Sequence, residues 1–289
     1  MNSFKPVLHE HRMPTRTTLS MTASKSALKG GIQVVFDAWE ELAVDAVNDE
    51  HDHRRETREH AVANVVLVHG LWVDGSNWAL VARELIDRGL SVTVVQLPLS
   101  SLADDTAVVR RALAQQNGPT VLVGHSYGGA VISAASHGAA QVEALVYVAA
   151  VAIGPGETPN EVLQHYTLSE GLQATVTDAN GYTIMDPQRF PDLFAGDIPR
   201  RQAEVLAVSQ GPAASACLTQ SVAEVGWRER PSWYVLCAHD RTVTPEAQQA
   251  IADRLGAKIS ISQASHAVTL SRPGDVVAAI EDAFASTHE

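Results

Sequence analysis

The sequence predicts an α/β fold: a mostly parallel sheet of about six strands, with helices on both faces and a helical cap insertion. Three observations support this prediction. From Val62 onward, short apolar runs alternate with amphipathic stretches, which is typical of a parallel sheet covered on both faces. One apolar run leads directly into a Gly-x-Ser-x-Gly motif at residues 124–128 and then into small residues suited to a helix. The alternation stops near residue 153 and resumes at Ser232, which indicates an insertion.

The composition fits one large globular domain with an insertion. The chain has 289 residues, of which 45% are hydrophobic and 19% are charged. Its formal net charge of -12 disfavours nucleic acid and anionic membrane surfaces as partners. No run approaches the roughly 20 apolar residues of a membrane span, and the N-terminus lacks the apolar core of a signal peptide. We therefore expect no membrane span and a cytoplasmic location. Two cysteines do not make a disulfide framework.

Residues 1–60 are expected to form an N-terminal extension to the domain at 61–289. Residues 1–30 are polar and lack periodicity, which indicates a disordered tail. Residues 32–47 have apolar side chains at helical spacing and predict an amphipathic helix. This helix either packs on the domain or forms a lid or a homodimer contact, and the sequence leaves these alternatives open. Residues 48–60 are a charged linker, whose histidines we do not expect to bind metal.

Each strand of the predicted sheet is a short apolar run bounded by turn-forming or polar residues. We expect strands at residues 65–68, 92–95, 119–123, 142–151, 233–238 and 258–261. Leu97-Pro98 ends the second run, because proline cannot continue a hydrogen-bonded ladder.

Helices are expected between these strands, at residues 76–88, 104–116, 245–255 and 275–284. The first has a single apolar stripe and stops at Gly89. Asp104 and Asp105 favour the positive N-terminal end of the second. Thr244 is placed to cap the third, with Pro245 in its first turn. Residues 153–228 contain helical pieces interrupted by prolines, and we predict that they form a cap over the site.

Ser126 is the candidate nucleophile. Strand, sharp turn and helix form the context in which Gly-x-Ser-x-Gly lifts a serine hydroxyl clear of the sheet. Gly124 and Gly128 are required in such a turn because side chains there would clash. The backbone N–H of Tyr127 would lie at the start of the following helix and point to where an oxyanion forms.

His266 and Asp240 are the candidate base and acid. A serine nucleophile needs a base to take its proton and an acid to hold that base in one tautomer. Asp240 and His266 follow the last two predicted strands, and the order Ser, Asp, His is the order expected for this architecture. Asp253 and Asp275 fit the acid role less well, because both fit helical positions.

The loop after the first strand, His69-Gly70-Leu71-Trp72, is expected to supply the second oxyanion donor. Gly70 allows close approach of the backbone, so that the N–H of Leu71 can join that of Tyr127. We interpret His69 as a structural residue beneath this loop.

From about residue 62 onward, the chain resembles the α/β-hydrolase superfamily. Residues 66–78, with their His-Gly…Trp loop, resemble plant methyl esterases, hydroxynitrile lyases and small bacterial carboxylesterases. The resemblance implies ester hydrolysis through an acyl-enzyme, with Ser126, Asp240 and His266 as triad and no cofactor or metal. Related hydroxynitrile lyases carry Thr where this chain has Gly70 and Lys where it has Ala267, so the resemblance disfavours lyase activity. The serine also excludes the aspartate-nucleophile chemistry of dehalogenases and epoxide hydrolases.

We therefore predict a serine carboxylesterase that acts on small, largely apolar esters. Its pocket is expected to be lined by apolar side chains near the triad and in the cap: Trp72, Val151, Leu163, Tyr166, Phe194 and Val268, beside Tyr127. Three alternatives stay open on the same triad. These are a cofactor-free perhydrolase, an acyltransferase that uses an alcohol in place of water, and a ligand receptor with vestigial hydrolysis.

Overall fold

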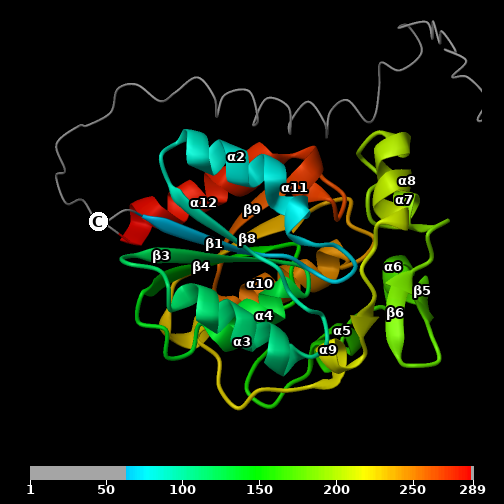
Figure 1. Ribbon diagram of the computed structural model, residues 1–289, viewed down its shortest axis with the longest axis horizontal. Coiled ribbons are helices and arrows are strands. Elements are labelled where there is room, and N and C mark those ends of the chain that lie inside the picture. Colours follow the sequence, from blue (N-terminus) through cyan, green and yellow to red (C-terminus); the bar gives the residue numbers. More distant parts are fainter. Residues whose placement is uncertain (1–62, 288–289) are drawn as a thin grey trace, which may run out of the picture. The chain divides into compact units, whose positions relative to one another are not determined.

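Six parallel strands form the central sheet of the molecule (Figure 1). The computed structural model describes residues 63–287, so the expectations for residues 1–60 lie outside it. The order of the sheet is β2-β1-β3-β4-β8-β9, and each neighbouring pair is parallel. The strands are β1 (Asn64–Val68), β2 (Ser91–Val95), β3 (Thr120–His125), β4 (Val142–Val148), β8 (Ser232–Cys237) and β9 (Lys258–Ser262). The predicted fold class is confirmed.

Helices cover both faces of this sheet, as Figure 1 shows. One face carries η1 (Gly75–Trp78), α2 (Ala79–Asp87), α11 (Val268–Ser271) and α12 (Pro273–Thr287), and the other carries α3 (Leu102–Leu113), α4 (Gly128–Ala135) and α10 (Pro245–Leu255). Each face of the sheet has its own apolar core. Val65 and Leu67 of β1 pack into the core on the face of α2 and α12, whereas Val66 and Val68 pack into the core on the face of α3 and α4. Because successive side chains of a strand point to opposite faces, a strand buried on both sides is an unbroken apolar run.

Local capping explains where the helices begin and end. Thr244 Oγ1 accepts from the N–H of Ala247, and Gly256 ends α10 in a left-handed conformation, so this helix has the predicted bounds. The helix α3 begins at Leu102, two residues before the prediction, because the Ser101 hydroxyl caps it by accepting from the N–H of Asp104 at 3.0 Å.

The strand β4 ends at Val148, three residues before the predicted end at Val151. Ala149 has a φ of 47°, in the left-handed region, which takes the chain out of the extended conformation. The chain then turns back, and the N–H of Val151 donates to the carbonyl of Ser126 at 3.0 Å.

The segment between β4 and β8 contains the cap, most of which lies on the right of Figure 1. The elements of the cap are α5 (Pro159–Gln164), α6 (Glu170–Gln173), β5 (Thr175–Thr177), β6 (Tyr182–Met185), α7 (Phe190–Leu193), α8 (Arg200–Val208), β7 (Ala213–Ala214) and α9 (Ala216–Thr219). The segment then continues through η2 (Trp227–Glu229) to the start of β4, where Arg230 donates to the carbonyl of Val142 at 2.7 Å. The small antiparallel sheet β5-β6-β7 was not predicted, because strands of two to four residues are too short to show an alternating pattern.

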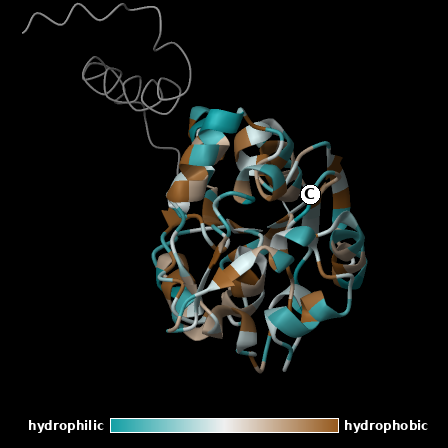
Figure 2. Ribbon diagram, turned by 90° about the vertical axis from the view of Figure 1, so that its right-hand side faces the viewer, coloured by the Kyte–Doolittle hydropathy of each residue, from teal (hydrophilic) through white to brown (hydrophobic). Residues whose placement is uncertain are grey.

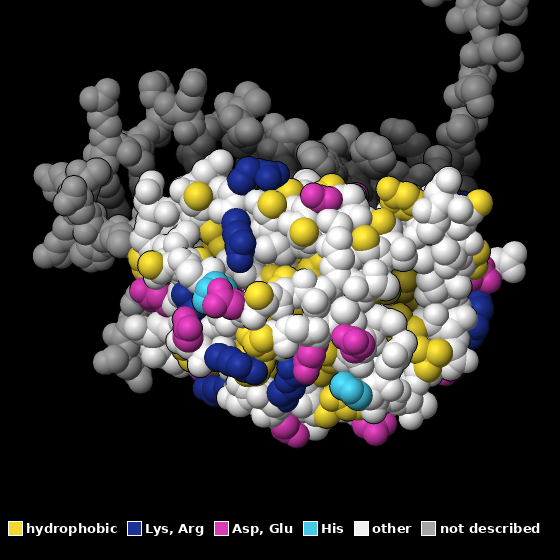
Figure 3. Space-filling view, turned by 90° about the horizontal axis from the view of Figure 1, so that it is seen from below, with side chains coloured by type: hydrophobic (Ala, Val, Ile, Leu, Met, Phe, Trp, Pro, Cys, Tyr) yellow, Lys and Arg dark blue, Asp and Glu magenta, His cyan; other side chains and the backbone are white. Residues whose placement is uncertain are grey.

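Hydrophilic and hydrophobic residues are mixed along the elements and, on one face, across the surface (Figure 2 and Figure 3). Seen from the cap side, the ribbons carry hydrophilic and hydrophobic bands side by side, as amphipathic elements do (Figure 2). On the face drawn in Figure 3, acidic and basic side chains are interspersed among small separate apolar areas. Within residues 63–287, no helix combines the length and the apolar character that crossing a membrane requires.

Candidate active site

Ser126 occupies a strained turn between β3 and α4. Its φ is 55°, in the left-handed region, which is costly for a residue with a side chain. A Cβ at Gly124 would lie 2.6 Å from the carbonyl oxygen of Gly128, and one at Gly128 would lie 2.5 Å from the carbonyl oxygen of Val68. Both clashes are with backbone, so only glycine fits at either position. The turn predicted from the motif is therefore present, and its strain lies at the serine.

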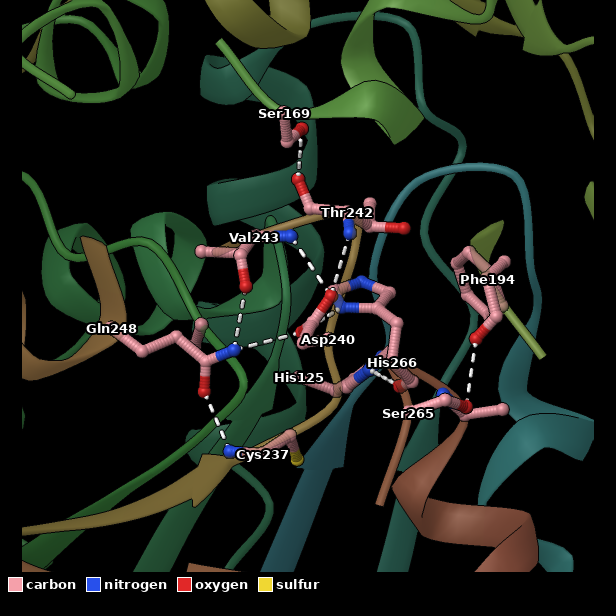
Figure 4. A network of polar contacts seen from close by, with 12 residues as sticks. His125, Ser169, Phe194, Cys237, Asp240, Thr242, Val243, Gln248, Ser265 and His266 are labelled. Atoms are coloured by element: carbon pink, nitrogen blue, oxygen red, sulfur yellow. Dashed lines mark hydrogen bonds and ion pairs between the residues drawn. The ribbon is translucent and has the colours of Figure 1, made fainter. Parts of the chain in front are cut away.

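Asp240 and His266 form a hydrogen-bonded pair at the carboxyl ends of β8 and β9 (Figure 4). Nδ1 of His266 lies 2.7 Å from Oδ2 of Asp240, and neither side chain is exposed. The other oxygen of Asp240 accepts from the N–H groups of Thr242 at 2.7 Å and Val243 at 3.0 Å. Because the carboxylate only accepts, it fixes the proton of a neutral His266 on Nδ1. Nε2 then carries the free lone pair that a general base needs.

The pair lies beside the serine turn. His125, directly before Ser126, has its ring centroid 4.7 Å from that of His266 and donates from Nε2 to the carbonyl of His266 at 2.9 Å. Nε2 of His266 has no hydrogen-bond partner among the described residues, and the structure holds no hydrogen bond from the Ser126 hydroxyl to it. Such contacts are often loose before substrate binds. The side chain of His125 therefore packs against His266.

The loop after β1 lies directly against the serine. A Cβ at Gly70 would be 2.6 Å from Cβ of Ser126 and 3.2 Å from its hydroxyl oxygen, so this close approach requires glycine. Neither the N–H of Leu71 nor that of Tyr127 has a hydrogen-bond acceptor within residues 63–287. Two free backbone donors beside a nucleophile are what an oxyanion hole requires.

His69 holds this loop from below, as the sequence analysis expected. Its Nε2 accepts from the N–H of Leu97 at 3.0 Å, so its Nδ1 carries the proton and donates to the carbonyl of Gly70 at 2.9 Å. Burial lowers the pKa of His69, which keeps the ring in the neutral form that this pair of bonds needs.

A mostly apolar cavity of about 20 Å³ lies against Ser126. It is lined by Leu71, Trp72, Ser126, Tyr127, Val151, Pro159, Leu163, Leu172, Leu218, Thr242 and Val243. The expected pocket residues Trp72, Val151 and Leu163 are among them. The cavity holds little more than one water-sized molecule, so a larger ligand has to displace side chains of the cap.

The other three expected pocket residues lie elsewhere in this structure. Phe194 packs edge-on against the ring of His266, with centroids 4.7 Å apart. Tyr166 is partly buried against the core on the face of the sheet that carries α3, α4 and α10. Val268 belongs to the core on the opposite face, with Trp78 and the residues of α12, because the chain has turned into α11 by that point.

The sequence analysis missed the wall residues Pro159, Leu172, Leu218, Thr242 and Val243. Thr242 and Val243 were within reach of sequence reasoning, because they follow the acid by two and three residues on the same loop. The three cap residues could not be predicted, because an irregular segment has no hydrophobic periodicity that shows which way a side chain points.

The cap also binds the loop that carries Asp240. The hydroxyl of Ser169 donates to the carbonyl of Thr242 at 2.6 Å, and the N–H of Gly171 donates to the carbonyl of Arg241 at 2.8 Å. Figure 4 shows the first of these bonds directly above Asp240.

The loop that carries His266 is held by the cap in the same way. Ser265 donates its N–H to the carboxylate of Asp197 at 2.8 Å. Its hydroxyl donates to that carboxylate and also lies 3.1 Å from the carbonyl oxygen of Phe194. The segment from Ser169 to Asp197 is therefore fastened to both loops, which makes this part of the cap a fixed wall of the site.

Comparison with known proteins agrees with this fold. The model of a family described as "Alpha/beta hydrolase family" matches residues 65–280. The chain belongs to the alpha/beta hydrolase family. Among curated members, a pyrethroid hydrolase from Sphingobium wenxiniae is 26% identical over 259 residues, with 76% of this chain and 87% of that protein covered.

Solved structures show the same fold. A pyrethroid hydrolase from Sphingobium faniae has a TM-score of 0.68 at 23% identity, covering 79% of this chain and 100% of that one. A methylesterase from Arabidopsis has a TM-score of 0.64 at 19% identity, covering 78% of this alpha/beta hydrolase and 100% of that chain. The resemblance to plant methyl esterases stated from the sequence is confirmed at the level of fold.

Proposed function

We propose that the protein is a serine carboxylesterase that hydrolyses small, largely apolar carboxylic esters through an acyl-enzyme intermediate. The buried contact between Asp240 and His266, beside a serine held in a strained turn, carries the proposal. Membership of the alpha/beta hydrolase family and the similarity to a pyrethroid hydrolase and a methylesterase support ester hydrolysis in general.

In the proposed mechanism, the Ser126 hydroxyl attacks the acyl carbon while Nε2 of His266 takes its proton. Asp240 stabilises the imidazolium, which then returns the proton from Nε2 to the departing alcohol oxygen. The N–H groups of Leu71 and Tyr127 stabilise the oxyanion, and each such donor is typically worth about 10²–10³ in rate. In the second half of the reaction, His266 activates a water that releases the acid and restores the serine.

The cavity wall supports the proposed substrate class. Its side chains are apolar except for Ser126, Thr242, the Tyr127 hydroxyl and the indole N–H of Trp72, and none of them carries a formal charge at neutral pH. Burial raises the pKa of Tyr127, so that its hydroxyl stays neutral. Such a wall favours an uncharged, apolar acyl or alcohol group. Trp72, Val151 and Leu163 are the proposed contacts for that group.

The test is hydrolysis of p-nitrophenyl esters of increasing chain length by the full chain and by Ser126→Ala. We expect turnover of the short esters and a loss of at least about 10³ in kcat for the variant, because the nucleophile is removed. Ser100→Ala, at a serine that bonds Asp104 on the surface, is the matched control. Ester turnover retained by Ser126→Ala would overturn the proposal.

The same assay separates the alternatives. Ester products formed with a competing alcohol would indicate an acyltransferase, and peracid formed with added peroxide would indicate a perhydrolase. A stoichiometric adduct on Ser126 without turnover would indicate a ligand receptor.

A further inference from the structure

A second buried carboxylate lies close to the serine turn, and the proposed mechanism does not use it. Asp105 lies in the first turn of α3 and is completely buried. One oxygen accepts from the N–H of Leu99 at 2.9 Å. The other accepts from the Tyr127 hydroxyl at 2.7 Å and from the Cys217 thiol at 3.6 Å. The carboxylate therefore collects donors from three separate segments of the chain.

The contact with Tyr127 reaches the proposed oxyanion hole. Tyr127 follows the nucleophile, begins α4, and lines the cavity beside Ser126. Its backbone is set by the turn, and its ring is held at the far end by Asp105. Fixing both ends of this residue restricts the direction of its N–H, and an oxyanion donor works only when it is held in place before the reaction.

The contact with Cys217 reaches the cap. Cys217 lies in α9, and its neighbour Leu218 forms part of the cavity wall. A second link runs parallel to it: the N–H of Ala214 in the cap donates to the carbonyl of Leu99 at 2.9 Å, and the N–H of Leu99 donates to Asp105. One carboxylate thus joins α3, the serine turn and one side of the cap.

We infer that Asp105 is a positioning residue of the proposed esterase reaction, which holds Tyr127 for oxyanion stabilisation and seats Leu218 against the bound ester. Its three neighbours all donate, so the arrangement is complete when Asp105 is ionised. Burial raises the pKa of Asp105, and the ionisable groups around it are Asp104, Tyr127 and Cys217. Burial and Asp105 together raise the pKa of Cys217 to about 12, so the thiol stays a donor.

The test compares Asp105→Asn with Asp104→Asn, which removes the same charge from the exposed neighbouring residue. We expect Asp105→Asn to lower kcat for a short p-nitrophenyl ester at least about tenfold near pH 8, with a smaller change in KM. The Asp104 variant is expected to stay within about twofold of the natural chain. Circular dichroism and thermal unfolding of each variant establish that it is folded.

The pH dependence separates positioning from a merely structural role. Both proteins keep the same proposed triad, so the ratio of their rates reports on the difference at Asp105. The advantage of the natural chain over Asp105→Asn should shrink as the pH falls, beginning at a higher pH than for an ordinary aspartate, because protonation removes the ionised acceptor. A ratio that does not change with pH would contradict the inference.

Tyr127→Phe provides the second variant. If Asp105 acts through the tyrosine hydroxyl, the loss in kcat for the double variant Asp105→Asn/Tyr127→Phe should be close to that of Asp105→Asn alone. Losses that multiply would overturn the inference. The inference rests on the proposed function, and the outcomes are distinguishable: an inactive natural chain refutes the esterase, whereas an active chain with an equally active Asp105→Asn refutes only the role of Asp105.

Discussion

The side-chain amide of Gln248 donates to Oδ2 of Asp240 at 2.8 Å, so it shares that oxygen with Nδ1 of His266. Gln248 comes from α10, is completely buried, and also accepts from the N–H of Cys237 at 2.9 Å. Figure 4 shows it on the opposite side of the carboxylate from the loop N–H groups. The proposed acid is therefore held by its own loop and by the helix that follows it.

Gln248→Leu is expected to lower both stability and kcat. The substitution keeps the size of the side chain but leaves the N–H of Cys237 unpaired, at a cost of about 1–3 kcal/mol in the free energy of unfolding. It also removes one donor from Asp240, and we expect kcat to fall about tenfold because the His266 ring is then held less firmly. Urea unfolding and ester kinetics measure the two effects. Gln249→Leu, at the exposed neighbouring position, is the control, and an unchanged kcat for folded Gln248→Leu would contradict the expectation.

Asp240→Asn is expected to reduce kcat by about 10³–10⁴, because an amide that donates to Nδ1 forces the proton of His266 onto Nε2. The lone pair that should take the Ser126 proton is then lost. Asp253→Asn is the matched control, since Asp253 is an exposed residue of α10 and the weaker candidate acid of the sequence. Steady-state kinetics of the two variants show which aspartate is the acid. A larger loss of kcat for Asp253→Asn than for Asp240→Asn would mean that the acid has been misassigned.

Leu163→Ala is expected to shift the preference toward longer esters. Leu163 is buried in α5 and lines a cavity too small for an ester, so truncating it adds space at the wall. We expect kcat/KM for longer acyl chains to rise about 10-fold or more relative to the shortest ester, since one methylene in an apolar pocket contributes about 1–3 kcal/mol, or about 10–200-fold. Leu168→Ala, at a cap residue that is 51% exposed, controls for loss of a leucine from the cap. Equal chain-length profiles for the two variants would exclude Leu163 from the pocket.

The parts of the fold that were predictable from the sequence are those with a local physical cause. The strands at residues 65–68 and 119–123 could be assigned because a strand buried on both faces leaves an unbroken apolar run. The turn at Ser126 could be assigned because the motif has glycine at the two positions where a side chain would clash with the backbone. Asp240 and His266 could be paired because parallel strands bring their carboxyl ends to one edge of the sheet.

The parts that were not predictable depend on contacts far apart in the chain. Phe194 was expected in the pocket but packs on the ring of His266, and Val268 was expected there but lies in the core across the sheet. Asp105 was interpreted only as a favourable charge at a helix start, whereas its carboxylate binds Tyr127 and Cys217. No local sequence pattern could predict where these side chains point, because each orientation depends on another segment that packs against it.

Burial of His125 is expected to make stability depend on pH. Burial holds the pKa of His125 well below its usual range, and its neighbours His266 and His69 lower it further. In the unfolded chain a histidine takes up a proton below about pH 6.5, which the folded protein cannot do at this site. The unfolded state therefore binds more protons, and the free energy of unfolding falls as the pH decreases below that value. His69 acts in the same direction, since burial also lowers its pKa.

His125→Asn should make this dependence weaker. Removing one such site lowers the slope of the free energy of unfolding by up to about 1.4 kcal/mol per pH unit between roughly pH 6.5 and 5, while His69 preserves part of the slope. The absolute stability also falls, because the ring packs against Trp78 and Phe194, so the slope is the informative quantity. Urea unfolding at a series of pH values measures it, with His239→Asn as the control at an exposed histidine. If His125→Asn keeps the full slope of the natural chain, His125 is protonated in the folded protein, and its hydrogen bond to the His266 carbonyl then comes from a cation.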